Sequence, residues 1–154
     1  MNEHSFVKSV HRKLDKSVYV WKIADRYSGG VPDAMYAGPA GILFIEYKYI
    51  KLPKRLTTVI KTSLSPLQEQ WITQMQQWKH PTWLVIGANK SCLILNKLTK
   101  NISTAYYLEN HTDTHTLAQL ITEATQGQPN DRKISQSQTT KNLSRKKSKE
   151  NLGR

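Results

Sequence analysis

The stretch ILFIEYKYI, residues 42–50, is the strongest strand signal in the chain. Its first four residues are apolar without interruption, which predicts burial on both faces and a central place in a sheet. The preceding GPAG, residues 38–41, is typical of a hairpin turn and connects this strand to a short strand predicted at 34–37. We therefore expect a hairpin at the centre of the fold.

Helical and strand patterns alternate along the rest of the chain. Ser65-Pro66 is a helix start, with serine as the N-cap and proline in the first turn. The predicted fold class is α/β, with a mixed central β-sheet flanked by helices. The further predicted elements are helices at 3–16 and 114–125 and strands at 18–23, 82–86, 91–95 and, at an edge, 104–108.

Several apolar and aromatic side chains are expected to be buried. The four tryptophans, among them Trp21 and Trp83 in strands, are interpreted mostly as core residues and not as platforms for nucleic-acid bases. The single cysteine, Cys92, is expected inside a strand, which excludes an internal disulfide and fits a reducing compartment. The helix residues predicted to face the core are Leu67, Trp71, Met75, Trp78, Leu117, Leu120 and Ile121.

The charge of the chain points to a polyanionic partner. Its 154 residues suffice for one domain with a modest core, and its formal net charge is +12. We divide it into a folded domain at 1–125 and a basic tail at 126–154, which has few apolar residues and is expected to be disordered. Eight Lys or Arg and two acids after residue 127 place half of the net charge in the tail. The other half belongs to the folded domain, which indicates nucleic acid as a partner.

A membrane location is not indicated. No apolar run approaches the ~20 residues that span a bilayer. The first residues are polar, so the start of the sequence shows no secretory signal. We therefore expect an intracellular, cytoplasmic protein without a membrane partner.

Two acids and one lysine are expected to meet on the central hairpin. Asp33 begins one strand and Glu46 lies inside the next, while Lys48 follows Glu46 by two residues and so shares its face. Mg²⁺ prefers oxygen ligands, and the backbone carbonyl of Tyr47 is a further oxygen at this point. A divalent cation held there would promote phosphodiester hydrolysis, with the lysine orienting water or stabilising charge on the phosphate.

A plainer interpretation of these residues is also open. Acid-x-Lys pairs are common on solvated strand faces, and a Pro-Asp pair is an ordinary turn element. Burying Glu46 and Lys48 on a central strand is costly without a function or partners, which favours the catalytic interpretation. Gly29-Gly30 is expected to keep the approach to Asp33 clear of side chains.

Three ordered motifs carry a resemblance to a known family. They are GVPD at 30–33, FIEYK at 44–48 and LSPLQEQW at 64–71, followed by the apolar strand WLVI at 83–86. Together they resemble the PD-(D/E)XK nuclease superfamily, and within it the VRR-NUC and phage-type endonucleases related to Holliday-junction resolvases. The similarity covers residues 3–96 and implies a restriction-endonuclease-like α/β/α core.

The resemblance also implies a chemistry and its residues. Asp33 and Glu46 would be ligands of Mg²⁺, with Mn²⁺ as a substitute, and Lys48 would be the catalytic lysine. Glu3 matches an additional acid of the metal site, although a first-turn acid is also explained by the helix dipole. Gln68 matches an active-site glutamine, although a solvated helix residue is the alternative. A phage or mobile-element origin, which would place the protein in a bacterial host cytoplasm, and a homodimer are compatible with this family.

Basic residues near the hairpin are expected to contact DNA phosphates, although solvated loops are the alternative. The predicted function is that of a metal-dependent DNA endonuclease. The alternatives are a nucleic-acid-binding protein without catalysis and a structure-specific junction resolvase on the same fold. The predicted DNA contacts are Lys22, Arg26, Lys51, Lys54, Arg55 and Lys61.

Overall fold

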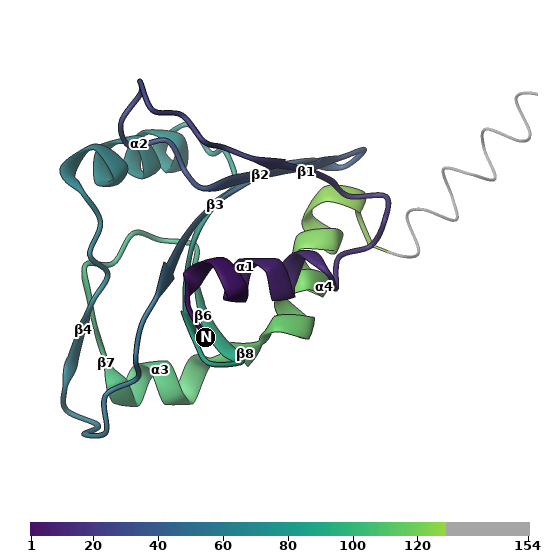
Figure 1. Cartoon of the computed structure of the whole chain (residues 1–154). Coiled ribbons are helices and arrows are strands. Elements are labelled where there is room, and N and C mark those ends of the chain that lie inside the picture. Colours follow the sequence, from purple (N-terminus) through teal and green to yellow (C-terminus); the bar gives the residue numbers. More distant parts are fainter. Residues whose placement is uncertain (129–154) are drawn as a thin grey trace, which may run out of the picture.

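The computed structural model describes residues 1–128 (Figure 1). The predicted tail therefore lies outside the described residues, apart from its first three positions. The elements follow the order α1 (Glu3–His11), β1 (Tyr19–Lys22), β2 (Ala34–Gly38), β3 (Gly41–Tyr49), β4 (Val59–Lys61), α2 (Pro66–Gln77), β5 (Thr82–Ala88), β6 (Ser91–Leu95), β7 (Asn101–Ser103), α3 (Thr104–Asn110), β8 (Thr112–Asp113) and α4 (Thr114–Gln126).

The main sheet has six strands in the order β1-β2-β3-β5-β6-β8. β3 pairs antiparallel with β2 and parallel with β5, so the sheet is mixed and β3 lies inside it, as predicted. A second sheet pairs β4 with β7. No helix within residues 1–128 is both long and apolar enough to cross a membrane.

The two faces of the sheet bury two separate cores, which confirms the α/β class with helices on both sides. α1 and α4 cover one face, and α2, α3 and the β4–β7 pair lie on the other (Figure 1). Side chains of β3 alternate between them, because successive residues of a strand point to opposite faces. Ile45 and Tyr47 enter the core beneath α1 and α4, whereas Phe44 contacts Trp71 of α2. Glu46 shares the face of Phe44 and therefore points toward α2.

A hydrogen-bonded chain of side chains fixes α1 to the sheet. His11 Nε2 lies 2.7 Å from Tyr36 Oη, which lies 2.6 Å from Tyr47 Oη. Burial, with a smaller effect of Lys22, lowers the pKa of His11 to about 4, so this imidazole is neutral at pH 7. α1 is thus anchored at its C-terminal end while its first turn, with Glu3, stays near the end of β3.

Several predicted elements are corrected by the structure. The predicted strand at 104–108 is α3, which begins after the N-cap Ser103. The first helix ends at His11 and not at residue 16, and β4 lies within the stretch 51–63, which shows no strand periodicity. Short strands of three residues leave too little alternation to be recognised from sequence.

The predicted inward face of α2 is wrong at both ends. Leu67 is 54 % exposed and Trp78 is 59 % exposed, whereas Ile72 is buried. The helix instead turns Gln68 and Gln76 inward with Ile72, at a spacing of four residues. Gln76 Nε2 donates to the Thr82 carbonyl and Gln68 Nε2 donates to Glu46. The spacing of apolar residues does not indicate which polar side chains turn inward to hydrogen-bond buried acceptors.

Two further burial predictions also fail. Trp21 is 52 % exposed, and Leu120 is 36 % exposed although Leu117 and Ile121 are buried. The apolar run at the start of β3 is buried only in part, since Ile42 is 48 % exposed. Cys92 is buried in β6, as predicted.

Candidate active site

Asp33 and Glu46 lie side by side on neighbouring strands. Ala34 of β2 pairs with Ile45 of β3 in antiparallel register. Asp33 therefore lies opposite Glu46. Asp33 Oδ2 accepts a hydrogen bond of 2.7 Å from the Tyr47 backbone N–H. Burial raises the pKa of Asp33, while the Tyr47 amide and Lys48 oppose the shift. The Tyr47 carbonyl points to the same edge of β3 as its N–H, and hence toward Asp33.

Glu46 is the central residue of the site. Only 1 % of it is exposed, and its Oε1 lies 2.8 Å from Lys48 Nζ and 2.5 Å from Gln68 Nε2. Its Oε2 is buried and has no hydrogen-bond partner among residues 1–128. Burial, and then the charge of Asp33, raise the pKa of Glu46 to about 7. A buried carboxylate oxygen without a partner is costly, because it has lost water and gained nothing in return.

Gln68 is oriented by the start of α2. Ser65 is the N-cap, and its side chain accepts from the Gln68 backbone while Gln68 Oε1 accepts from the Ser65 backbone N–H at 3.0 Å. This capping box fixes which end of the amide is the acceptor and turns Nε2 toward Glu46. Ser65 is predicted from the sequence as a cap, but this positioning role is not, although the Ser-x-x-Gln spacing is a signal for it.

Glu3 lies within electrostatic reach of the pair but does not complete a cluster of acids. Burial, followed by the charge of Asp33, raises the pKa of Glu3, while Lys48 and the Tyr49 backbone amide lower it. Among the described residues, no group of three or more His, Cys, Asp or Glu side chains is placed to hold a metal ion. A cation at this site would therefore depend on two carboxylates completed by other oxygens.

The oxygens present fit a hard divalent cation. Among the described residues, Glu46 Oε2 has no hydrogen-bond partner, and Asp33 accepts from the Tyr47 N–H with only its Oδ2. The Tyr47 carbonyl lies on the Asp33 side of β3. Carboxylates and carbonyls are the ligands that Mg²⁺ and Mn²⁺ prefer, whereas the site offers no thiolate or imidazole. A bound cation would satisfy the unpartnered oxygen and offset the repulsion between the two acids.

Gly29-Gly30 packs closely against α2, which is a role that the sequence pattern did not predict. A Cβ on Gly29 would lie 2.5 Å from Leu67 Cδ1, and one on Gly30 would collide with the Leu67 carbonyl. Gly30 also has φ of +87°. The glycines therefore let the loop before Asp33 lie directly on the first turn of α2, close to Gln68.

Gly30→Ala is expected to lower the free energy of unfolding by about 2–3 kcal/mol, from strain at positive φ and collision with Leu67. Gly41→Ala is the matched control, because Gly41 has φ of +151° and nothing within 4 Å of a Cβ. Urea unfolding of both variants measures the difference. Equal losses would show that the contact with Leu67 contributes nothing.

The predicted DNA-contacting residues do not form one group. Lys22 lowers the pKa of His11 and shares the face of Val20, so it lies on the α1 side, opposite Glu46. Arg26 lies in the loop between β1 and β2. Lys61 lies four residues before the N-cap of α2, and all six predicted residues are exposed. The remaining three, Lys51, Lys54 and Arg55, follow β3 on the connection to β4.

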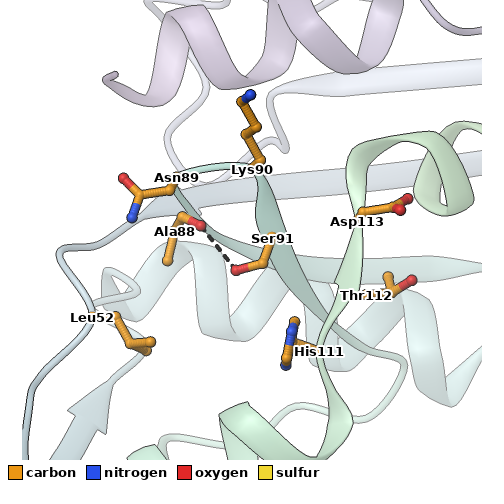
Figure 2. A pocket seen from close by; sticks show the side chains of 8 residues that line it. All are labelled: Leu52, Ala88, Asn89, Lys90, Ser91, His111, Thr112 and Asp113. Carbon is orange, nitrogen blue, oxygen red and sulfur yellow. Dashed lines mark hydrogen bonds between the residues drawn. The ribbon is translucent and has the colours of Figure 1, made fainter.

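A hollow of about 540 Å³ lies at the turn between β5 and β6 (Figure 2). Asn89 of this turn donates its backbone N–H to Tyr49 Oη at 3.0 Å, which places the hollow near the end of β3. Lys90 and Asp113 bring opposite charges to its wall, and His111 lies between them and Leu52. None of the predicted site residues lines it.

Comparisons with known proteins add a resemblance in shape. No protein-family profile matches the sequence. No curated protein sequence matches it either. Among solved structures, the chain is similar to Hjc of Archaeoglobus fulgidus, a Holliday junction resolvase from an archaeal hyperthermophile, at 15 % identity and a TM-score of 0.48. The match covers 77 % of this chain and 97 % of that chain. At these values the likeness carries no argument about activity, so the function has to be inferred from the geometry of the site.

Proposed function

We propose that this protein is a metal-dependent endonuclease that hydrolyses phosphodiester bonds of DNA. One observation carries the proposal: Glu46 is fully buried beside Asp33, and one of its oxygens has no hydrogen-bond partner in the described part of the chain. Two acids placed side by side, one of them buried on the central strand β3, are an unfavourable arrangement for stability alone. A cation such as Mg²⁺, or Mn²⁺ in its place, held by both carboxylates would offset this cost.

Each residue of the site has a role in this proposal. Asp33, Glu46 and the Tyr47 carbonyl would hold the cation, with Glu3 as a further acid within reach. When bound, the cation polarises the phosphate and makes a water molecule a better nucleophile. Lys48 is 22 % exposed, so its ammonium can contact a phosphate while it remains paired with Glu46. Gln68 Nε2 donates a hydrogen bond to Glu46 Oε1 and so holds the carboxylate in one orientation. Glu46 Oε2 is left for the cation.

The charge of the protein supports DNA as the substrate. The net charge is +12, and the basic residues after β3 and in the β1–β2 loop flank the strand that carries the site. Contacts of Lys51, Lys54, Arg55, Lys61 and Arg26 with phosphates would make binding fall steeply as salt rises. Lys22 would contact DNA only if the duplex also reaches the α1 face.

We further place the chain in the PD-(D/E)XK superfamily, in the branch of VRR-NUC and phage-type enzymes related to junction resolvases. This placement rests on the three motifs and on the convergence of Asp33, Glu46, Lys48 and Gln68. It would make the protein an intracellular enzyme, active in a bacterial cytoplasm if it is phage-encoded. Cleavage of a four-way junction compared with a linear duplex of the same sequence tests for a junction resolvase.

A binding protein without catalysis is the second candidate, favoured by the lack of a three-acid cluster within residues 1–128. Such a protein would use the same basic surface, while Glu46 and Lys48 would form only a buried ion pair.

Asp33→Asn and Lys48→Ala are expected to lower the rate of Mg²⁺-dependent plasmid cleavage by on the order of 10³-fold, with little change in DNA affinity. Asn keeps an acceptor for the Tyr47 N–H and removes only the charge. Gel analysis of nicked and linear product measures the rate, and fluorescence anisotropy measures binding. If wild type and variants bind DNA and all leave it intact, the second candidate holds.

A further inference from the structure

The second sheet leaves one edge of β7 without a strand partner among residues 1–128. β7 pairs only with β4, and on that side Thr104 donates its N–H to the Thr58 carbonyl at 2.9 Å. In an antiparallel pair the backbone groups of successive residues point alternately toward the partner strand and away from it. The N–H and C=O groups of Asn101 and Ser103 therefore point away from β4. Within the described part of the chain, neither of these two N–H groups donates a hydrogen bond.

A hollow of about 400 Å³ lies along this free edge of β7, and we call it the edge hollow. Its apolar floor consists of Leu95 and Ile102, which are only 7 % and 6 % exposed. Tyr106 of α3 lines one side and is 45 % exposed, so its ring is accessible to a ligand. No lining residue belongs to β4, which places the hollow at the edge where the backbone groups are free. The lining residues are Leu95, Thr99, Asn101, Ile102, Ser103 and Tyr106.

Basic side chains surround the edge hollow. Lys61 pairs with Asn101 across β4 and β7, so their side chains lie next to each other on one face. Lys100 is 70 % exposed and forms an ion pair of 2.9 Å with Glu69 of α2. Lys97 is exposed in the segment that connects β6 to β7. Three lysines at the rim favour a ligand that carries negative charge.

We propose that the edge hollow binds one unpaired nucleotide of a DNA strand. The face of the base would stack on Tyr106 above the apolar floor. The edge of a base carries hydrogen-bond donors and acceptors, which would pair with the free backbone groups of Asn101 and Ser103. The phosphate would lie among the three lysines of the rim. The volume of about 400 Å³ lies within the range of roughly 300–1,000 Å³ that small-ligand sites occupy.

The bound nucleotide has to be unpaired. Within a duplex both faces of a base are covered by its neighbours, and its edge is paired with the other strand. Stacking on a single aromatic side chain does not depend on which base is present, because every base has a flat face. The edge hollow therefore recognises an exposed nucleotide by its chemistry.

A peptide strand is the other ligand that a free strand edge can take. β7 has only three residues, whereas a strand usually has about 5–6, so an added peptide would gain few backbone hydrogen bonds. An aromatic wall beside a basic rim matches a base with its phosphate. These features favour the nucleotide.

The edge hollow and the proposed active site are joined by the first turn of α2. Gln68 contacts Glu46, whereas the next residue, Glu69, pairs with Lys100 at the rim. Figure 1 shows β4 and β7 side by side beneath this helix. A preferred substrate would thus carry an unpaired nucleotide close to the position of cleavage. This consequence rests on the proposed function, whereas the nucleotide site itself does not.

Fluorescence anisotropy of the full chain in EDTA, which prevents metal-dependent cleavage, tests the proposal. The two probes are a paired duplex and the same duplex with one extra, unpaired nucleotide. The wild type is expected to bind the bulged duplex about tenfold more tightly, because one base gains a stacking partner. Tyr106→Ala should remove this preference, whereas Tyr106→Phe keeps the ring and should retain it.

Tyr19→Ala is the matched control, since Tyr19 is 61 % exposed on β1 of the main sheet. It should keep the preference for the bulged duplex. Circular dichroism checks that each variant is folded. Equal binding of the two duplexes by the wild type overturns the proposal, and so does a preference that survives in Tyr106→Ala.

Amide chemical shifts test the role of the free edge. On addition of deoxynucleoside monophosphates, the N–H groups of Asn101 and Ser103 should shift most. The N–H of Ile102 faces β4 and should shift less, so it is an internal control. If these amides shift with an acidic peptide and not with nucleotides, the edge takes a peptide strand and the proposal is wrong.

This inference and the proposed function fail separately. A preference for the bulged duplex in a protein that does not cleave DNA in Mg²⁺ would uphold the nucleotide site and refute the proposed function. Cleavage by a protein that binds both duplexes equally would uphold the proposed function and overturn the nucleotide site.

Discussion

Glu46→Gln is expected to abolish cleavage and at the same time to make the metal-free protein more stable. Loss of the cation-binding charge should lower the cleavage rate by on the order of 10³-fold or more. The ionised carboxylate is costly in the folded state, as its pKa of about 7 shows. Removing that cost should raise the free energy of unfolding at pH 8 by about 1–3 kcal/mol.

The opposing effect is the lost ion pair with Lys48. That lysine is 22 % exposed, so water screens part of the attraction, and a glutamine can still accept from Lys48 and from Gln68. The substitution removes the buried charge and leaves only the partly solvated Lys48 without its ion pair, so we expect the loss of attraction to be smaller than the desolvation cost of the carboxylate. The stabilising effect therefore prevails.

Glu69→Gln is the control for this pair of effects. Glu69 follows Gln68 in the chain but pairs with Lys100, which is 70 % exposed, at 2.9 Å. We expect its cleavage rate and stability to stay near those of the wild type. Thermal unfolding in EDTA, together with plasmid cleavage in Mg²⁺, measures both properties. A Glu46→Gln protein that cleaves at the wild-type rate, or that unfolds more easily, would refute the assignment of Glu46.

Mg²⁺ is expected to stabilise the protein at pH 8 but hardly at pH 5.5. In the unfolded chain Glu46 loses its proton near its ordinary pKa of 4.5, whereas in the folded protein it keeps the proton up to about pH 7. The metal-free protein therefore loses stability as pH rises through this window, and the loss is complete above pH 7. A cation that needs the ionised carboxylate must displace a proton below pH 7, so its apparent affinity falls about tenfold per pH unit.

At saturating Mg²⁺, near 100 times the Kd, the gain at pH 8 should be about 3 kcal/mol, or roughly 10 °C in Tm. His11 changes stability in the opposite direction, since its lowered pKa of about 4 makes stability fall as pH drops below 6.5. That effect is the same with and without Mg²⁺, so the difference between the two melting curves isolates the site. Glu46→Gln should show no such difference at either pH. A gain equal at pH 5.5 and pH 8 would mean that Mg²⁺ binds elsewhere.

Local patterns were sufficient for the central hairpin and for the first turn of α2. The strand at 42–50, the GPAG turn and the Ser65-Pro66 helix start all depend on neighbouring residues, and the structure places each within one residue of its prediction. The convergence of Asp33, Glu46 and Lys48 followed from the same hairpin, because antiparallel pairing and alternation of side chains are local rules.

What the sequence by itself determined is therefore which side chains meet at the candidate site, namely Asp33, Glu46 and Lys48, and which strand carries Glu46 and Lys48. Only the tertiary structure decided the environment of the Glu46 carboxylate. Its unpartnered oxygen and its raised pKa depend on how α2 and the Gly29-Gly30 loop pack around it. It also decided which apolar residues remain exposed. Trp21 and Ile42 have the pattern of core residues, yet the face they share is covered by α2 only in part, and the length and placement of a distant helix are not encoded in the periodicity of a strand.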